Sequence, residues 1–224
     1  MPSYSGIWTL QQQMQAIAQS LWPDPPPTVI GQAYGGGYYA GQIGVSGVAT
    51  HYLVVGPVAS AQNLSITYKN VNTATTGADS VIDGPQNTAD IVADGNATVY
   101  PSGHFCNNLV VGGYSDWYMP AINELEVCYF NLKPTTQANN TSFGINANAV
   151  PARASNYTAG NPAQTTAAAF ITSTGAEAFT ASGYWSSTED SATTARLQRF
   201  DGGVQNGYDK NYVLRVRAIR RVAV

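Results

Sequence analysis

The side chains best suited to contact a ligand are concentrated near the C-terminus. Residues 184–212 are rich in Tyr, Trp, Ser, Asn, Gln and Arg, and seven of the ten basic residues of the chain lie between Arg196 and Arg221. Tyr provides contact area at a low cost in conformational entropy, and Ser and Asn provide adaptable hydrogen bonds. This composition predicts a binding surface for a polar ligand. A solvated, Arg-bearing strand is the alternative interpretation of the same residues.

Groups suited to catalysis do not converge in the sequence. His51 falls in an expected strand and His104 in an expected loop. Glu124 and Glu126 are two residues apart on an expected helix, so their side chains point in different directions, whereas glycosidases need two carboxylates that flank one bond. We therefore predict a protein without catalytic activity, and an enzyme that degrades surface polysaccharide is the less favoured alternative.

No metal or cofactor site is predicted. Cys106 and Cys128 lack the company of further Cys or His residues that a zinc site requires. A calcium loop of the Asp-x-Asp-x-Asp-Gly kind is missing. The three glycines at residues 35–37 precede an expected strand, whereas phosphate-binding glycines precede a helix. We expect the two cysteines to be buried thiols.

The composition limits the classes of protein to consider. Charged residues make up 10% of the 224 residues, against about 25% in ordinary globular domains, and hydrophobic residues make up 44%. A net charge of −3 argues against a general nucleic-acid binder, which would carry a basic surface. No apolar run is long enough to span a membrane, and residues 1–10 do not have the pattern of a signal peptide.

The N-terminal segment is expected to be separate from the remaining chain. Residues 9–21 have the spacing of an amphipathic helix without charge, and residues 23–27 form a proline-rich spacer. Such a short helix is marginal in water unless its apolar face is covered. We predict that residues 1–30 anchor the chain to other proteins or to further copies of itself, with a trimer favoured, and that 31–224 form one domain. Packing of the helix on its own domain is the alternative. The predicted contact residues are Trp8, Leu10, Met14, Ile17 and Leu21.

The first part of the domain is predicted to begin with a β-hairpin. Residues 38–43 and 50–55 are strand-like and flank a turn at 45–47. Scattered turn signals predict long ordered loops over 60–105. Pro120 and the acidic residues that follow it predict a helix over 121–132.

The second part of the domain is predicted to end in strands. We expect a long loop over 134–162 and a short helix over 164–171. Strands over 195–200 and 204–208 flank a turn at 201–203. In a final strand over 213–222, Leu214, Val216 and Ala218 would point inward and Arg215 and Arg217 outward.

Three segments carry a resemblance to a known family. Residues 112–120 read Gly-Gly-Tyr-Ser-Asp-Trp-Tyr-Met-Pro and are followed by Asn123-Glu124-Leu125. Residues 184–189 read Tyr-Trp-Ser-Ser-Thr-Glu, and 216–220 read Val-Arg-Ala-Ile-Arg. Together with Phe-Asp-Gly-Gly at 200–203 and Lys210, these segments resemble the C-type-lectin-like domain of phage tail-fibre and receptor-binding proteins, a fold shared with the variable proteins of diversity-generating retroelements. Tyr118 and Met119 depart mildly from the usual residues of the signature.

The resemblance implies a fold class. It is α+β, with small antiparallel sheets, two main flanking helices and long loops, here preceded by the N-terminal helix and polyproline linker. The N-terminal and C-terminal strands of the domain would pair with each other. Calcium-dependent lectins carry Glu-Pro-Asn and Trp-Asn-Asp triplets, which this sequence lacks, so sugar binding through calcium is not expected.

The resemblance also implies where a ligand binds. In the family, the variable side chains lie between the Trp-Ser-Ser element and the final strand. Together with the composition of this segment, that position predicts a set of ligand-binding residues: Arg196, Gln198, Arg199, Gln205, Asn206, Tyr208, Asp209 and Asn211. Trp185 and Phe200 would be the scaffold of the site.

The start of the chain resembles the short leader of many phage virion proteins. The expected function is therefore a tail-fibre or tail-tip protein that recognises a receptor on the host surface, a glycan or a protein, without a cofactor. Its other partners would be virion proteins, with no nucleic acid or membrane, and it would be assembled into the virion in the bacterial cytoplasm. A structural or decoration protein of the head or tail is the alternative.

Overall fold

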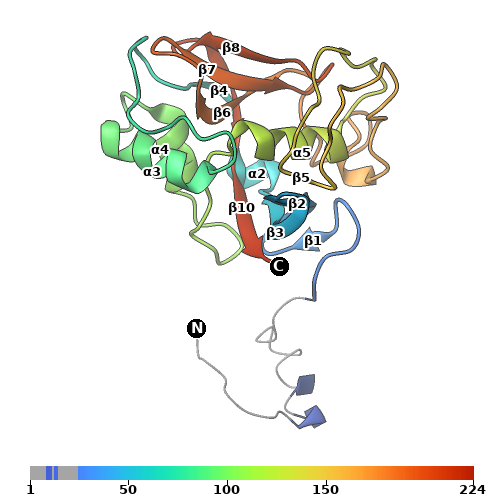
Figure 1. The fold of residues 1–224 in the computed structure, drawn as a ribbon. Helices are drawn as coiled ribbons and strands as arrows, with labels where there is room; N and C mark the ends of the chain where they lie inside the picture. Colours follow the sequence, from blue (N-terminus) through green and yellow to red (C-terminus); the bar gives the residue numbers. More distant parts are fainter. Residues whose placement is uncertain (1–8, 12, 15–24) are drawn as a thin grey trace.

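The computed structural model describes residues 9–11, 13–14 and 25–224, which form a mixed α+β structure built on two curled sheets (Figure 1). The first sheet has the order β1-β2-β3-β10, with β5 added beside β2. Its strands are β1 (Ala33–Tyr34), β2 (Gly37–Val45), β3 (Val48–Val55), β5 (Ala149–Val150) and β10 (Ile219–Ala223).

The predicted hairpin is confirmed as β2 and β3. Ser46 and Gly47 have φ angles of 52° and 78°, and two left-handed residues in succession are what a tight two-residue hairpin turn needs. On the other side of β3, β10 pairs in antiparallel register, with Ile219 opposite Val55. The strands from the two ends of the domain therefore lie side by side, as the resemblance implies.

The second sheet has the order β4-β9-β6-β7-β8. Its strands are β4 (Gln62–Thr67), β6 (Gly183–Glu189), β7 (Thr194–Arg199), β8 (Gln205–Asp209) and β9 (Val213–Arg217). All of its pairs are antiparallel except that between β6 and β9. The strands expected over 195–200 and 204–208 are thus present as β7 and β8.

The prediction of one final strand over 213–222 is wrong. The segment forms β9 in one sheet and β10 in the other, and Ala218 lies between them, where its N–H donates to Ala61 O at 2.9 Å. Val216 and Ala218 are buried as expected, but Arg217 is also fully buried instead of facing outward. The alternation of apolar and charged residues continues along the sequence. Residues 213–217 and 219–223 nevertheless belong to different sheets, so the side chains of one face do not keep the same surroundings.

The prediction of long loops over 60–105 is also wrong. This region holds β4 and the helices α3 (Gly84–Asp94) and α4 (Pro101–Asn107), and α2 (Val58–Ala61) precedes it. Asp83 caps α3 by accepting a hydrogen bond from the N–H of Gln86. Asp followed shortly by Pro is a signal for a helix start as well as for a turn.

The helix predicted over 121–132 is confirmed as α5 (Ile122–Leu132), which is largely buried. The helix expected over 164–171 shortens to the 3₁₀ turn Ala168–Phe170. The segment 134–162 is mainly loop, as predicted, and contributes β5 to the first sheet.

Two apolar clusters form the core, one on each side of the second sheet. Tyr184 belongs to the cluster with Leu125 and Phe200. The next residue, Trp185, belongs to the cluster with Tyr68. Because successive residues of a strand point to opposite faces, β6 separates the two clusters and has little contact with solvent.

The described domain has two distinct ends (Figure 1). Residues 25–34 and the C-terminus lie at the lower end, whereas β7 and β8 lie at the opposite, upper end. Of the predicted N-terminal helix, Leu10 and Met14 are helical and exposed; Trp8, Ile17 and Leu21 lie outside the described residues. Among the helices of the described residues, none has the length and apolar character needed to cross a membrane.

Candidate functional site

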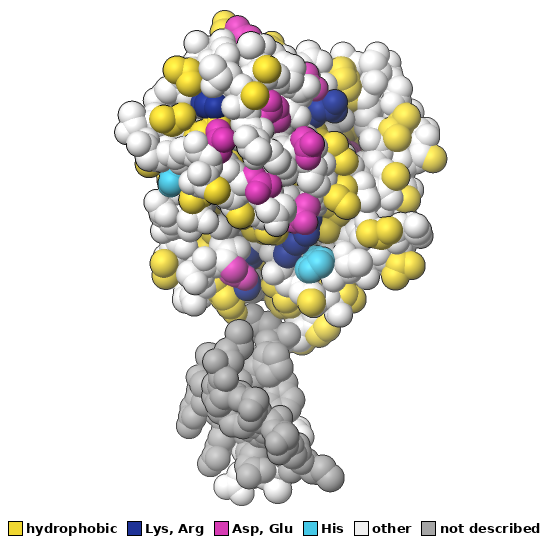
Figure 2. Space-filling view, turned by 60° about the vertical axis from the view of Figure 1, so that its left-hand side comes forward, with side chains coloured by type: hydrophobic (Ala, Val, Ile, Leu, Met, Phe, Trp, Pro, Cys, Tyr) yellow, Lys and Arg dark blue, Asp and Glu magenta, His cyan; other side chains and the backbone are white. Residues whose placement is uncertain are grey.

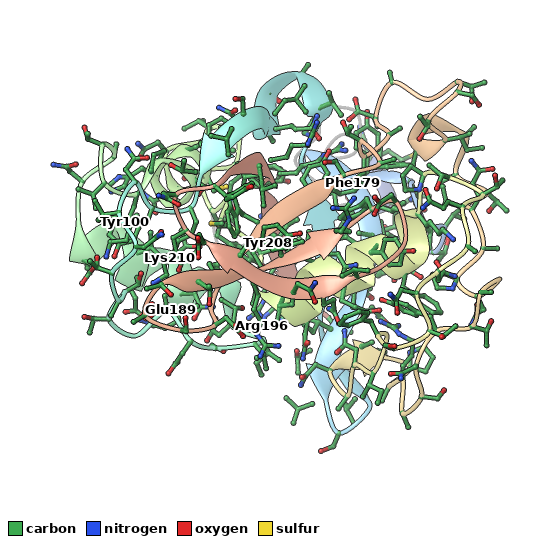
Figure 3. All side chains as sticks on the ribbon, turned by 90° about the horizontal axis from the view of Figure 1, so that it is seen from above. Tyr100, Phe179, Glu189, Arg196, Tyr208 and Lys210 are labelled. Atoms are coloured by element: carbon green, nitrogen blue, oxygen red, sulfur yellow. The ribbon has the colours of Figure 1, made fainter. Side chains whose placement is uncertain are left out.

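The predicted ligand-binding residues lie on or beside the β7–β8 hairpin at the upper end of the domain, seen from above in Figure 3. We call the hairpin with its flanking turns 190–193 and 210–212 the hairpin surface. The turns before β7 and after β8 meet, because the N–H of Lys210 donates to Thr193 O at 3.0 Å. The three segments therefore form one continuous surface.

The strand register divides the predicted residues between two faces. Residues directly opposite each other in an antiparallel pair point to the same face. Gln205 lies opposite Gln198, and these two share a face with Arg196 and Asp209. Asn206 and Tyr208 lie opposite Leu197 and Ala195, on the other face. One ligand thus meets only some of the predicted residues at once, unless it reaches around the edge of β8.

Gln198 is not part of the exposed surface. Its exposed fraction is 0%, and its Nε2 donates to Arg199 O at 3.1 Å. Its Oε1 has no hydrogen-bond partner among the described residues. The prediction that Gln198 contacts a ligand is therefore corrected: α5 packs against β7 and covers this position.

Two arginines of the predicted set are held by neighbouring carboxylates. Arg196 Nε lies 3.0 Å from Asp190 Oδ1, and its side chain remains 45% exposed. Arg199 Nε donates to Asp201 Oδ1 at 3.0 Å. Burial alone would raise the pKa of Asp201, but the hydrogen bonds and charge of Arg199 outweigh it and hold this pKa below its ordinary value. Both guanidinium groups are thus oriented and locally neutralised.

Apolar and aromatic side chains lie beside these polar groups. Tyr208 packs partly on the core, and its ring lies 5.8 Å from that of Tyr212 in an edge-to-face arrangement. Tyr212 and its neighbour Val213 are 56% and 57% exposed. Asn206, Asp209 and Asn211 are also exposed. Tyr212 was not in the predicted set, although a Tyr in a polar turn after a strand was a signal for it.

Trp185 and Phe200 lie in the interior beneath this surface. Both are fully buried. The Trp185 Nε1–H donates to Ile66 O at 3.3 Å, and Phe200 stacks on Phe179 with ring centroids 3.9 Å apart. Each ring fills one of the two core clusters, so a change at either position would act on folding before it acts on binding.

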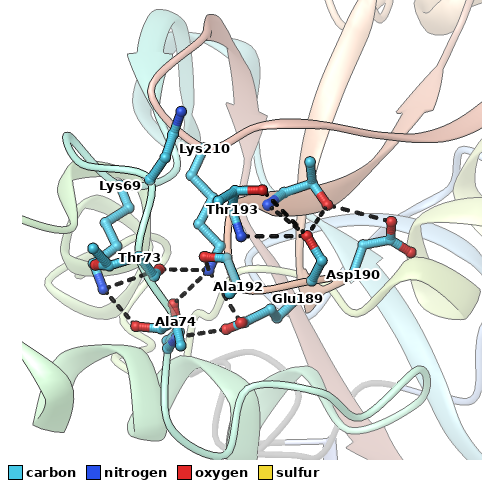
Figure 4. A network of polar contacts seen from close by, with 12 residues as sticks. Lys69, Thr73, Ala74, Glu189, Asp190, Ala192, Thr193 and Lys210 are labelled. Atoms are coloured by element: carbon cyan, nitrogen blue, oxygen red, sulfur yellow. Dashed lines mark hydrogen bonds and ion pairs between the residues drawn. The ribbon is translucent and has the colours of Figure 1, made fainter.

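A buried lysine holds the turns of the hairpin surface together (Figure 4). Lys210 has an exposed fraction of 0%. Its Nζ donates to Thr73 O at 2.8 Å and Ala192 O at 3.0 Å, and lies 3.2 Å from Glu189 Oε1. Burial lowers the pKa of Lys210, and Glu189 partly opposes that effect.

A second lysine extends the same network. Lys69 Nζ donates to Ala74 O at 2.7 Å and to Thr73 O at 3.3 Å. Glu189 Oε2 accepts from the N–H of Thr75 at 2.7 Å. The segment 73–75 is therefore tied to both turns of the hairpin surface through charged groups. No local sequence pattern indicates this role, because a lysine among polar residues has the pattern of a solvated one.

The carboxylates considered for catalysis are separated and serve the interior. Glu124 accepts from Arg221 Nε at 2.6 Å, whereas Glu126 accepts from Tyr157 OH at 2.6 Å. Both are fully buried, and burial raises the pKa of each carboxyl group. As predicted, the two side chains point apart.

The remaining candidate groups are structural in their contacts. His104 lies in α4 instead of the predicted loop, and its Nε2 is 2.6 Å from Gly95 O. Cys106 and Cys128 are buried thiols, as expected. In the described ranges, no three His, Cys, Asp or Glu side chains are grouped so that they could hold a metal ion.

Comparison with known proteins does not assign a function to these residues. No family model matches the sequence, and no curated protein matches it. The function of the hairpin surface is therefore argued from its position, its exposed side chains and the network that supports it.

Proposed function

We propose that this chain is a bacteriophage virion protein of the tail fibre or tail tip whose domain 31–224 is lectin-like and recognises a receptor on the host surface, a glycan or a protein, without catalysis. Residues 1–30 would attach it to the particle or to further copies of itself.

The position of the hairpin surface carries the proposal. The domain receives the chain from residues 25–34 at one end and presents β7 and β8 at the other (Figure 1). A receptor-binding module needs this arrangement, because the surface that attaches to the particle and the surface that meets the cell must face in opposite directions. Leu10 and Met14, which are 73% and 63% exposed, are apolar side chains suited to an attachment surface.

The chemistry of the hairpin surface fits recognition by neutral hydrogen bonds and rings. Asn206, Asn211 and Tyr212 are exposed, and the charges of Arg196 and Arg199 are balanced by Asp190 and Asp201. The two-lysine network fixes the turns beneath them, which lowers the entropy cost of binding.

The arrangement of the signature segments supports a lectin-like fold. Tyr118 and Ile219 exchange two backbone hydrogen bonds, of 2.9 and 3.0 Å. The N–H of Ser187 donates to Pro120 O at 2.8 Å. The three segments that carry the resemblance are therefore in direct contact with one another, although about 100 residues separate the first from the last.

The test is binding of the full chain to cells. Fluorescently labelled full-length protein is incubated with a panel of bacterial strains, and bound protein is measured by flow cytometry. A triple variant, Arg196→Ala with Asn206→Ala and Asn211→Ala, changes three exposed side chains of the hairpin surface. We expect binding to at least one strain, weakened about twofold to tenfold in the variant, because the substitutions lie on both faces of the hairpin and a ligand on either face loses at least one contact of about 0.5–1.5 kcal/mol.

A matched control changes exposed side chains outside the hairpin surface. The variant Val45→Ala with Val48→Ala alters the tip of the β2–β3 hairpin, where both residues are exposed, and should bind cells like the wild type. Equal binding by the triple variant and the wild type would refute the proposal. In electron micrographs of virions that carry the chain, antibody labelling along the whole capsid would instead support the decoration alternative.

A further inference from the structure

A second site lies on the flank of the domain, away from the hairpin surface. A cavity of about 290 Å³ opens between α3, the end of α4 and the extended segment 115–118. Its lining includes Pro85, Ala89, Asn107, Asp116 and Trp117. This volume is near the lower end of the range of about 300–1,000 Å³ for small-molecule pockets, so it suits a single small ring.

An oriented carboxylate stands in the lining of this cavity. Arg220 Nε and Nη2 donate to the two oxygens of Asp116 at 2.7 and 2.8 Å. Arg220 is in turn fixed by Gly35 O at 3.0 Å and by the ring of Tyr114, 3.7 Å from its guanidinium carbon. The Asp116 side chain nevertheless remains 54% exposed. Each of its oxygens has a second lone pair, so the group can still accept hydrogen bonds from a ligand.

Other polar groups of the lining differ in how many hydrogen bonds they already make within the protein. Thr88 Oγ1 donates to Gly84 O and accepts from the N–H of Met119, so it has little left to offer. The Asn107 side chain, within the described part of the molecule, bonds just to Asn108 at 3.4 Å. An acid and an amide are thus available beside the apolar surface of Pro85 and Ala89.

Charge around the cavity selects against anionic ligands. Acidic side chains gather on the face that contains α3 and α4 (Figure 2); those that are exposed or half-buried include Asp79, Asp83, Asp90 and Asp94. This field disfavours anions. The guanidinium groups of Arg220 and Arg221 lie next to the cavity but are paired with Asp116 and Glu124, so neither is free to bind an anion.

We propose that this cavity binds one neutral, polyhydroxylated ring, such as a single sugar unit. Ring hydroxyls donate to Asp116 and exchange hydrogen bonds with Asn107, and the apolar side of the ring packs on Pro85 and Ala89. The cavity and the hairpin surface have no residue in common, so this site is independent of the proposed receptor-binding role.

The test is saturation-transfer NMR on the full-length protein with glucose, galactose, mannose, rhamnose and N-acetylglucosamine. We expect transfer to at least one of these sugars. Ala89 is exposed, so Ala89→Phe fills the cavity without disturbing the core and should abolish the signal. Asp116→Asn should weaken binding about tenfold or more, since a hydrogen bond to a charged group is lost.

The matched control is Gln86→Phe, which adds the same ring to an exposed position of α3 outside the cavity and should bind like the wild type. The hairpin triple variant should also keep its sugar binding, which separates failure of this inference from failure of the proposed function. Absence of transfer to all five sugars, or transfer that survives Ala89→Phe, would overturn the inference. Binding of glucuronate in preference to glucose would overturn the neutral class of ligand.

Discussion

The guanidinium of Arg217, the last residue of β9, lies 2.8 Å from the carboxylate of Glu177. Arg217 is fully buried, and it also donates to Gly56 O at 2.8 Å and to Glu177 O at 2.7 Å. Its guanidinium packs over the ring of Phe179, 4.7 Å from the centroid. The arginine therefore connects β9 to Gly56 and Glu177, which lie outside β4 and β6, the two strands that pair with β9.

The first prediction concerns this ion pair. Burial lowers the pKa of Arg217 to about 10, so the side chain is charged at neutral pH and depends on Glu177. Glu177→Gln leaves that charge without its partner, which typically costs about 3–5 kcal/mol of folding free energy. Urea denaturation at pH 7 measures the loss. Arg215→Met, on the same strand but half-buried, is the control and should cost about 1 kcal/mol or less.

The second prediction concerns the close packing at Gly84. A Cβ at this position would lie 2.3 Å from Glu124 Oε2 and 2.5 Å from a ring carbon of Tyr118. Gly84→Ala should therefore lower the free energy of unfolding by about 1–3 kcal/mol. Gly160→Ala meets no atom within 4 Å and should leave it nearly unchanged. Similar unfolding midpoints for both variants would show that α3 can shift to accommodate the methyl group.

Local sequence patterns predicted the elements in which each face has the same surroundings from one end of the element to the other. The β2–β3 hairpin follows from two strand-like segments that flank the turn at residues 45–47, and α5 from an apolar stripe after Pro120. Both are bounded by local signals, the turn at Ser46 and Gly47 and the Pro120 that precedes the helix. The fold class, α+β with mainly antiparallel sheets, follows instead from the resemblance carried by residues 112–120, 184–189 and 216–220.

Elements that depend on distant partners could not be predicted in this way. The alternation from Val213 to Val222 is continuous, but whether Arg217 is buried depends on Glu177 and Gly56, which the strand itself does not specify. The start of α3 was not predicted for another reason. Asp83 and Pro85 favour both a turn and a helix start, and packing of the helix on α4 and β6 decides between them.

The candidate site was predicted as a segment and not as a surface. Composition located the hairpin and its flanking turns, but the side on which each residue points follows from the register of β7 and β8. The length of the turn between them sets that register. The burial of Gln198 and Lys210 depends on α5 and on carbonyl oxygens far away in the sequence, so no local pattern could reveal it.

The third prediction concerns acid sensitivity at the hairpin turn. The pKa of Asp201 is lowered in the folded protein, so the folded state binds this proton less readily than the unfolded chain. Its contribution to stability is therefore present above the ordinary pKa of an aspartate and is lost as the pH falls through the lowered value. Asp201→Asn should cost about 1 kcal/mol or less at pH 6, as expected for a partly exposed pair.

The same variant should differ less from the wild type as the solution becomes more acidic. Urea denaturation at pH 6, 4 and 2.5 measures the difference in free energy of unfolding at each pH. A difference that stays constant over this range would contradict the assignment of the pH dependence to Asp201. Asp209→Asn, at an exposed position of β8, is the control and should follow the wild type at every pH.

The fourth prediction concerns Lys210 and the order of the hairpin surface. Lys210→Met keeps the apolar part of the side chain and removes the donor that joins Thr73, Ala192 and Glu189. The two carbonyl oxygens and the carboxylate then lose a common partner in the interior. The turns 190–193 and 73–75 should open more often, and their amide hydrogens should exchange faster.

Hydrogen exchange followed by mass spectrometry separates this local effect from a general loss of stability. Peptides that cover 70–76 and 190–195 should exchange at least tenfold faster in Lys210→Met, whereas peptides from β2, β3 and α5 should change much less. Asn206→Ala, which alters an exposed residue of the same hairpin, should leave the turns protected. If all peptides of Lys210→Met accelerate equally, the lysine supports the whole fold and not the hairpin surface in particular. Because an ordered surface binds at lower entropy cost, the local outcome also predicts weaker cell binding by Lys210→Met, although its side chain touches no ligand.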